Sequence, residues 1–532
     1  MSKYTHARAS DPKVDSTLGI DPMLPLSSRA SLKATQRAAL ANNRGRFSAR
    51  CSGAGRGSFL RTGATSVLCA ILPGEAQAHG LGARYDLPLP LWLYLLGAGA
   101  AVAASFAFLT LFRTSARPIK PRSLVFARGR LPWSLVAVLQ GLSMGLFLLI
   151  VMAGLLGNQN PFKNITPVFV WVIWWVGMTL LAAFVVNPWP LVNPAVIAWE
   201  WGRRWSDGFR TSAPGRGRFQ AYPPWLGAWP AAALFLLMAW LELIAPGRDI
   251  PRNIALGALA YLGLSWIGCR LFGPAVWLRN ADPFAVAFAI LGRFAPLQVA
   301  RTGLRGCWWL RPYAVGLLSD RPLSISLTAF TLLMLATVSV DGLLETPAWM
   351  IVVELVDRLG TEGESSGDVL ATMLLCLAPL VFGGAYLVVI AMMRMASGEA
   401  EHSLSTLAGR FVLPLVPIAI AYHLAHYLSF LLLAGQFAIP LASDPFGFGW
   451  DLFGTALYRI DIGIVDARFV WLMAVGAIVI GHIVATWLAH ETALAVFVTS
   501  KAARKSQGPM LVLMVGYTVL SLWILSQPIV EP

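Results

Sequence analysis

The sequence predicts an all-helical integral membrane protein with about ten transmembrane helices, accompanied by cytoplasmic interfacial helices. Three observations support this fold class: the chain is poor in charge, it contains ten long apolar segments, and basic residues gather in alternate loops. Of its 532 residues, 57% are hydrophobic and only 13% are charged, whereas a soluble domain carries about 25% charged residues. A bilayer accommodates this apolar surface because its interior is itself apolar.

The N-terminal part of the chain differs in composition from the rest. Residues 1–62 are polar, basic and rich in Ser, Ala and Arg, which predicts a disordered extension. In residues 63–78, the short apolar stretch Ala64–Leu72 is followed by Ala76-Gln77-Ala78, a pattern typical of a secretory signal. We therefore expect cleavage after Ala78, which leaves residues 79–532 as the transmembrane domain with its mature N-terminus outside.

The apolar segments are each long enough to cross a bilayer, which takes about 20 helical residues. They are residues 88–112, 133–156, 166–186, 224–244, 253–273, 324–343, 369–393, 411–435, 469–499 and 509–526. The ninth is the longest, so we expect it to tilt or to extend past the interface.

The loops between these segments alternate in charge. With the N-terminus outside, the inner loops hold 23 Lys or Arg residues and the outer loops hold seven. Because basic loops remain in the cytoplasm, this asymmetry supports the orientation. The outer loops are acidic, and one contains an amphipathic segment, Pro347–Leu359, that is expected at the outer surface. The net charge of +15 therefore reflects membrane orientation and the basic extension rather than nucleic-acid binding.

Two similar segments follow the third and fifth apolar segments. Asn193-Pro194 and Asp282-Pro283 each combine a helix-capping residue with proline at the first helical position, followed by an apolar face. One interpretation is a duplicated unit of two spans and a cytoplasmic interfacial helix. Two unrelated amphipathic helices would produce the same pattern.

Ionisable side chains within the apolar segments are the candidates for chemistry, because such groups are costly in hydrocarbon. His423 and His426 lie near the middle of the eighth segment, flanked by Tyr422 and Tyr427. The two histidines are three positions apart and therefore share one helix face.

Other ionisable residues lie in neighbouring segments. His482 is at mid-depth in the ninth segment, and His490 with Glu491 lies closer to the cytoplasm. Asp341 ends the sixth segment on the outer side.

Imidazole and carboxylate groups are frequent metal ligands, and an open coordination position on such a metal activates water as a nucleophile. We predict a divalent metal ion, zinc or copper, bound by His423, His426, His482 and Asp341. His490 and Glu491 form a predicted secondary metal site, and the candidate catalytic residues are Asp341, Tyr422 and Tyr427.

Other roles for these histidines remain open. They could ligate haem between the eighth and ninth segments, form a proton or metal path, or make structural hydrogen bonds between helices. After signal cleavage, His79 would be the first residue, and its α-amine and imidazole could chelate copper together.

Several strings in the sequence are shared with one family. They are HGLGARYDLPLPLWL from His79, ADPF from Ala281, SVDG from Ser339 and AYHLAHYLSF from Ala421. With these strings, the chain from about His79 to the last apolar segment resembles bacterial membrane proteins known as fenitrothion hydrolases. The resemblance implies a hydrolase in the bacterial inner membrane that cleaves apolar organophosphorus triesters and releases a nitrophenol. It also implies a second, related membrane subunit as a partner.

Two other classes of function fit the same residues. A copper or proton-coupled transporter would use intramembrane histidines and acidic outer loops. A haem-binding electron carrier would use the histidines as axial ligands. Metal and pigment analysis of the purified protein distinguishes these classes from the hydrolase.

Overall fold

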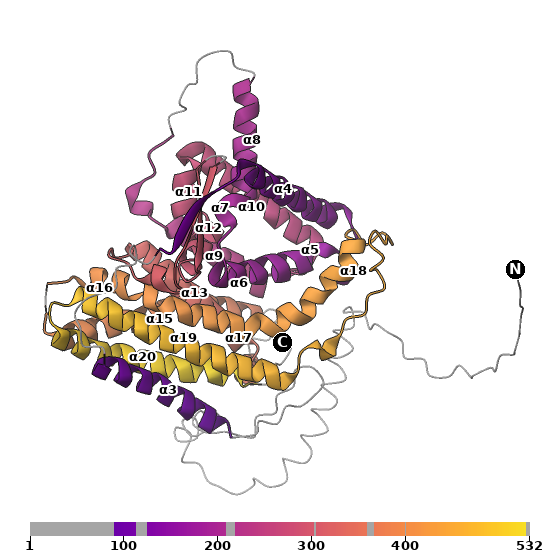
Figure 1. Ribbon diagram of the computed structural model, residues 1–532. Coiled ribbons are helices and arrows are strands. Elements are labelled where there is room, and N and C mark those ends of the chain that lie inside the picture. The colour runs from indigo at the N-terminus through magenta and orange to yellow at the C-terminus, as the bar shows by residue number, and fades with distance from the viewer. Residues whose placement is uncertain are drawn as a thin grey trace, which may run out of the picture. The chain divides into compact units, whose positions relative to one another are not determined.

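The chain is a multi-pass membrane protein built almost entirely of helices. The computed structural model describes residues 90–112, 125–208, 219–302, 305–358, 366–399 and 401–527. Within these residues, nine helices are long and apolar enough to cross a membrane, which confirms the predicted polytopic helical fold (Figure 1). The predicted extension, the signal segment and His79 lie outside the described residues.

One group of long helices packs together around the last two helices of the chain. α17 packs against α19, α19 packs against α20, and α3 lies along both α19 and α20 (Figure 1). The members are α3 (Leu91–Phe112), α15 (Ser366–Ser397), α17 (Val416–Ala434), α19 (Ala467–Val496) and α20 (Ser500–Leu525). α16 (Leu404–Phe411) precedes α17, and α18 (Ala438–Ser443) follows it.

A second group forms around α4 and α10, which pack against each other and against α8. Its members are α4 (Trp133–Leu156), α8 (Pro194–Gly208), α10 (Pro251–Phe272) and α11 (Pro274–Asn280). α13 (Ile325–Leu344) contacts α15 and α17 of the first group and also α9 (Trp229–Leu243). It is the most thoroughly buried long helix, since nearly every residue from Phe330 to Gly342 is buried.

Three of the predicted spans do not correspond to a single helix with the expected start and length. The fourth is α9, with only 15 residues, and the tenth begins at Ser500 and continues through Pro509. Residues predicted as a basic loop before the last span are therefore its first turns. The third consists of α5 (Ile165–Pro167), a π-helix (Val168–Val176) and α6 (Gly177–Phe184).

Several short helical turns lie among the described residues. They are α7 (Trp189–Val192) and the 3₁₀ turns Pro161–Lys163, Pro224–Leu226, Val315–Leu317, Leu413–Leu415, Gly435–Phe437 and Ile462–Ile464.

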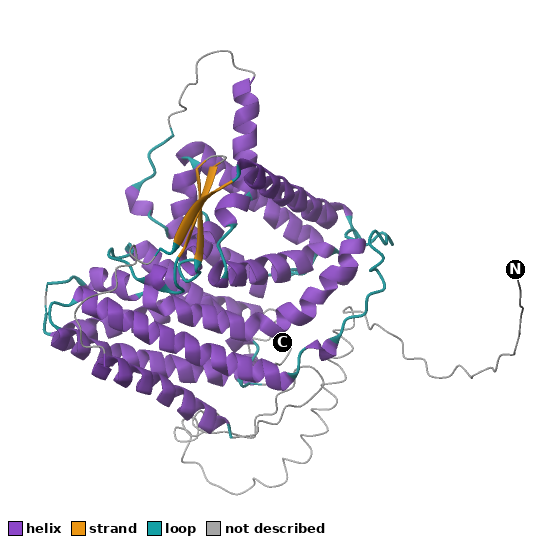
Figure 2. Ribbon diagram, in the orientation of Figure 1, coloured by secondary structure: helices purple, strands orange, loops and turns teal. Residues whose placement is uncertain are grey.

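A small antiparallel sheet joins two of the loops between predicted spans (Figure 2). Its strand order is β1 (Ala127–Leu131), β3 (Arg305–Leu310) and β2 (Leu297–Thr302). Arg130 pairs with Cys307 across β1 and β3. The sheet pairs the loop before α4 with the hairpin that precedes α13, so it connects distant parts of the chain.

The two capped segments meet in space. The Asn193 side chain accepts hydrogen bonds from the backbone of Ala195 and Val196, and Asp282 accepts one from Ala285, which confirms both caps. The Asn193 amide nitrogen also lies 3.4 Å from the Asp282 carboxylate. Every residue of α12 (Pro283–Leu291), which Asp282 caps, is buried except Ala289. The helix therefore differs from the surface helix expected at this position.

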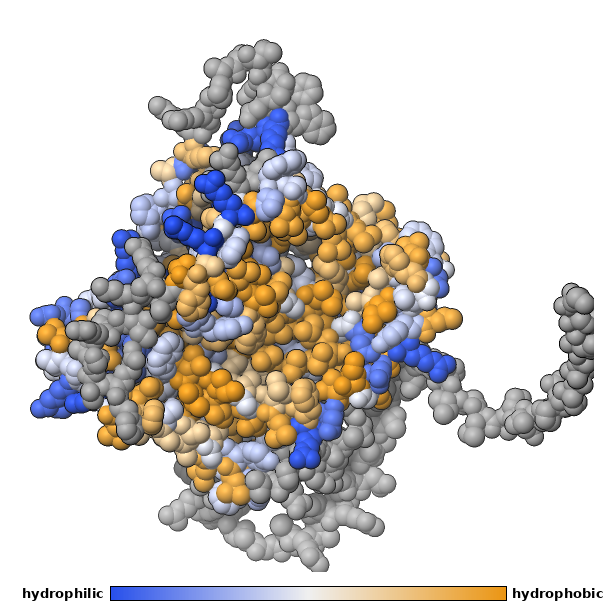
Figure 3. All heavy atoms as spheres, in the orientation of Figure 1, coloured by the Kyte–Doolittle hydropathy of each residue, from blue (hydrophilic) through white to orange (hydrophobic). Residues whose placement is uncertain are grey.

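Apolar side chains dominate the visible face of the described residues in Figure 3, and blue side chains gather toward its margins. Leu142, Leu380 and Val388 are examples of exposed apolar residues on long helices. α14 (Pro347–Arg358) has no buried residue, and it exposes Met350 and Ile351. A lipid environment covers such surfaces without the cost that water would impose.

Candidate functional site

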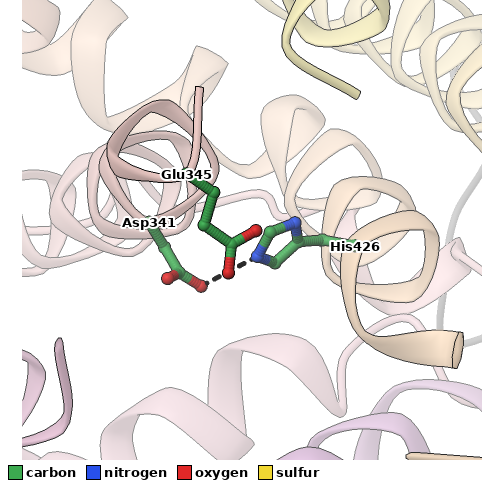
Figure 4. Close-up of side chains that lie close together, drawn as sticks. All are labelled: Asp341, Glu345 and His426. Carbon is green, nitrogen blue, oxygen red and sulfur yellow. Dashed lines mark hydrogen bonds and ion pairs between the residues drawn. The ribbon is translucent and has the colours of Figure 1, made fainter. Parts of the chain in front are cut away.

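The candidate site begins at the C-terminal end of α13. The Ser324 side chain accepts a hydrogen bond from the backbone of Leu327 and so caps the start of this helix. Asp341 lies in the last turn of the helix, and Glu345 caps its end. Residues four positions apart lie on the same helix face, so the two carboxylates point to one side (Figure 4).

α17 supplies the groups that face these carboxylates. His426 Nε2 lies 3.0 Å from Asp341 Oδ2, and both side chains are only 11% exposed. The Tyr427 hydroxyl donates to the same carboxylate oxygen. Asp341 is therefore held by two donors from one helix, an arrangement that fixes the direction of its carboxylate.

Asp341, Glu345 and His426 form the only group among the described residues with the composition and spacing to hold a metal ion. One ligand atom from each lies within 4.8 Å of the others, and the three side chains point toward one another (Figure 4). We call this group the Asp341 cluster. Three protein ligands with a free position are typical of catalytic rather than structural zinc sites.

A cavity of about 50 Å³ adjoins the cluster. Glu242 of α9, Asp341 of α13, and His423 and Tyr427 of α17 supply polar groups to its wall. Trp175 of the π-helix completes one side. The volume exceeds the roughly 15 Å³ that one water needs, so the cavity has room for water or an ion. It is far too small for a haem.

His423 borders this cavity with an unsatisfied ring nitrogen. Its ring centroid lies 4.6 Å from that of Tyr427 and 6.4 Å from that of Trp175. Its Nε2 is buried and has no hydrogen-bond partner in the protein. A buried polar atom of this kind calls for a water or an ion, and the adjoining cavity has room for either. The π-helix that supplies Trp175 is a rare conformation that recurs near functional sites.

Burial changes the pKa of one carboxyl group at the end of α13, that of Glu345. Glu345 lies just beyond the apolar stretch Ile325–Leu344. Burial raises the pKa of its carboxyl, whereas nearby His426 opposes that rise and Asp341 adds to it. A bound cation would favour the ionised form of this carboxyl.

The remaining predicted residues do not join the Asp341 cluster. His482 is fully buried, with Nδ1 2.8 Å from the carbonyl oxygen of Ile478 and its ring near Tyr517. The Tyr422 hydroxyl is buried without a hydrogen-bond partner, beside α13 at Gly342.

The predicted secondary metal site, His490 and Glu491, lies where α19 contacts α20. His490 Nδ1 lies 3.0 Å from Gln507 Oε1 on α20, and Glu491 is buried beside it in sequence. Neither belongs to a group of metal ligands among the described residues.

Two carboxylates near the site were absent from the predicted ligand set. Glu345 falls just beyond the predicted sixth span, 324–343, although its spacing of four from Asp341 is a helical signal. Glu242 falls within the predicted fourth span, 224–244, but the sequence does not reveal which face of α9 meets α13. Packing of α9 against α13 brings it to the cavity.

Comparisons with known proteins provide no relative for this chain. No family model matches it, and neither the curated proteins nor the solved structures contain a match.

Proposed function

We propose that the chain is a metal-dependent membrane hydrolase of apolar esters such as organophosphorus triesters. The observation that carries the proposal is the convergence of Asp341, Glu345 and His426 beside a cavity with room for water. The resemblance to fenitrothion hydrolases supplies the substrate class. We further propose a location in the bacterial inner membrane, with the basic loops in the cytoplasm and the Asp341 cluster toward the outer side.

Each residue has a distinct task in this proposal. Asp341, Glu345 and His426 would hold a divalent ion, while Tyr427 fixes the Asp341 carboxylate by hydrogen bonding. Such an ion would supply Lewis acidity and lower the pKa of a water toward neutrality. Attack of the water oxygen would form a new bond to phosphorus as the bond to the nitrophenolate leaving group breaks, and one proton of the water would pass to solvent.

The cavity is large enough to supply water to the Asp341 cluster but too small to bind the ester. An organophosphorus triester is larger than a cavity of about 50 Å³. Glu345 and His426 are both partly exposed, and α14, which contacts α13, presents exposed apolar residues. We propose that the ester reaches the Asp341 cluster from the lipid beside these helices.

The test is metal content and hydrolysis in one detergent-purified preparation. Elemental mass spectrometry should find a divalent metal, and a nitrophenyl phosphotriester should release coloured nitrophenolate. Glu345→Gln should lose both, whereas Glu354→Gln, on exposed α14, should lose neither. A wild-type protein that hydrolyses the ester without bound metal would refute the metal-dependent mechanism.

Proton-coupled metal transport is the second candidate, supported by polar groups buried along α19 and α20. The Tyr517 hydroxyl lies 2.6 Å from that of Ser339 and its ring is near His482. A smaller cavity of about 10 Å³ lies beside Thr486 and Gln507. Polar residues at this depth are typical of proton relays.

Reconstituted vesicles distinguish the two candidates. A transporter would move the metal ion across the vesicle membrane and acidify or alkalinise the lumen. His482→Ala would abolish that flux while the Asp341 cluster kept its ion. Ester hydrolysis with no ion flux in the wild-type protein would exclude the transport candidate.

A further inference from the structure

We propose that Arg293 and Arg311 form a binding site for the phosphate group of an anionic phospholipid. Arg293 follows α12 and Arg311 follows β3, so both lie in the basic loop between the fifth and sixth predicted spans. The site shares no residue with the Asp341 cluster, and the inference does not depend on the proposed function.

The loop backbone holds the two arginines side by side. Arg311 Nη2 donates to the carbonyl oxygen of Arg293 over 2.9 Å. The Arg311 guanidinium lies against Gly316, where an added methyl group would collide with it and with the Arg293 carbonyl. The two guanidinium groups are close enough to interact electrostatically. The fold therefore places two like charges together instead of separating them.

Neither guanidinium has an acidic partner among the described residues. The Arg293 side chain makes no hydrogen bond or ion pair with them, and Arg311 bonds only the Arg293 carbonyl, which leaves its buried Nε without a partner. Burial lowers the pKa of Arg293, and burial with the nearby Arg293 charge lowers the pKa of Arg311 to about 10. Both groups remain charged at neutral pH, and partly buried charges without partners favour a bound counterion.

A third arginine of the same loop shows how a structural arginine differs. Arg301 on β2 forms a buried ion pair with Glu200 of α8, so its charge is balanced within the protein. Packing between helices and the sheet thus accounts for Arg301. It does not account for Arg293, whose side chain has no such partner among the described residues.

Exposed apolar side chains beside the two arginines favour a lipid over a free anion. Tyr313, two residues after Arg311, is 52% exposed, and its hydroxyl donates to a carbonyl at the end of α6. Val185 and Leu310 are also exposed. Leu297 connects these two residues, because its backbone N–H donates to the Val185 carbonyl and it pairs with Leu310. Tyrosine is enriched where a membrane meets water, so an acyl chain would lie along these side chains.

The chemistry of the pair matches a net-anionic headgroup. Guanidinium groups bind phosphate oxygens through paired N–H···O bonds, and basic pockets between membrane helices on the cytoplasmic side bind anionic headgroups. A zwitterionic lipid carries its own cation beside the phosphate, which two arginines would repel. Phosphatidylglycerol, whose only charge is its phosphate, is therefore the suitable probe.

The experiment measures lipid binding to the full-length protein in a non-ionic detergent. Native mass spectrometry counts bound lipid, and thermal unfolding measures the stabilisation that the lipid gives. The wild-type protein should prefer phosphatidylglycerol to phosphatidylcholine by at least about tenfold. Arg293→Gln should lower the affinity for phosphatidylglycerol at least about fivefold, and Arg293→Lys should restore part of it. Arg279→Gln, which removes an exposed charge from α11, should leave the affinity within about twofold, because exposed charges are screened.

The outcomes distinguish a lipid site from its alternatives. Without lipid, Arg293→Gln should unfold at the wild-type temperature or above it, because the substitution removes a charge that has no partner among the described residues. Equal affinity for phosphatidylglycerol in the wild-type protein and Arg293→Gln would overturn the site. Stabilisation by inorganic phosphate as large as that by phosphatidylglycerol would overturn the lipid assignment. Neither readout involves a metal ion or ester hydrolysis, so failure here leaves the proposed function untouched.

Discussion

The Asp341 cluster and the His490–Gln507 pair both place a histidine of one helix against an oxygen acceptor of another. At the pair, the Gln507 amide nitrogen donates to the Ala503 carbonyl, so its oxygen faces His490. At the cluster, two carboxylates face one histidine, and a cavity with an unsatisfied histidine nitrogen lies alongside.

This difference separates a structural histidine from a candidate ligand. Burial alone does not identify a site, because His482 and His490 are both fully buried. An unsatisfied ring nitrogen alone does not identify one either, because His482 Nε2 also lacks a hydrogen-bond partner in the protein. Unbalanced charge together with open space is the more specific sign, because protein interiors are closely packed and buried polar groups are normally paired.

The largest expected effect comes from Asp341→Asn. The substitution preserves shape but removes a charged ligand of the proposed ion, so we expect loss of metal and a fall of at least about 100-fold in ester hydrolysis. Metal content and nitrophenolate release are the measurements. His490→Gln, in the His490–Gln507 pair, should change metal content and ester hydrolysis by no more than about twofold. Equal losses in both variants would show that the Asp341 cluster and the pair do not differ in function.

A smaller effect is expected when the support of Asp341 is removed. Tyr427→Phe deletes the hydroxyl that donates to Asp341, and loss of such an orienting group lowers metal affinity roughly 10–100-fold. Competition with a fluorescent chelator measures the affinity. Tyr517→Phe is the matched control, because its hydroxyl contacts Ser339 instead. Unchanged affinity in Tyr427→Phe would show that Asp341 needs no such support.

The His490–Gln507 pair should affect stability rather than chemistry. Gln507→Leu leaves the His490 Nδ1 donor without its acceptor, which costs about 1–3 kcal/mol. Thermal unfolding in detergent should shift to lower temperature while metal content stays at the wild-type value. Loss of metal in this variant would mean that the two regions are energetically coupled.

The sequence predicted the fold better than the site because hydropathy reports burial in lipid but not rotation of one helix against another. α19 was expected at 469–499 and occupies Ala467–Val496. The tenth span was predicted at 509–526, but α20 begins at Ser500 and continues through Pro509, since membrane helices tolerate internal proline. The sheet strands carry no long alternating pattern, and their pairing depends on contacts distant in sequence.

At the site, the structure joins His426 to Asp341, two residues of the predicted ligand set, but not His482. His423 and His426 share a helix, so their proximity follows from helical geometry. Whether His482 faces the same space depends on the rotation of α19, which no local signal gives. Glu345 was missed because the predicted span ends at residue 343, whereas α13 ends at Leu344 and Glu345 caps it.

The smallest expected effect concerns Asp282, a buried carboxylate outside the Asp341 cluster. Like the His490–Gln507 pair, it is hydrogen-bonded within the protein. Tyr261 donates to it at 2.7 Å and the Ala285 backbone at 2.8 Å, yet burial raises its pKa above the ordinary carboxyl value. The folded protein therefore retains this proton longer than the unfolded chain, so its contribution to stability falls as pH rises through the raised pKa. Asp282→Asn keeps a good helix cap and should flatten the decline in melting temperature from acidic to neutral pH. An unchanged pH profile would show that Asp282 is already ionised in the folded protein. It would then resemble the carboxylates of the Asp341 cluster rather than the His490–Gln507 pair.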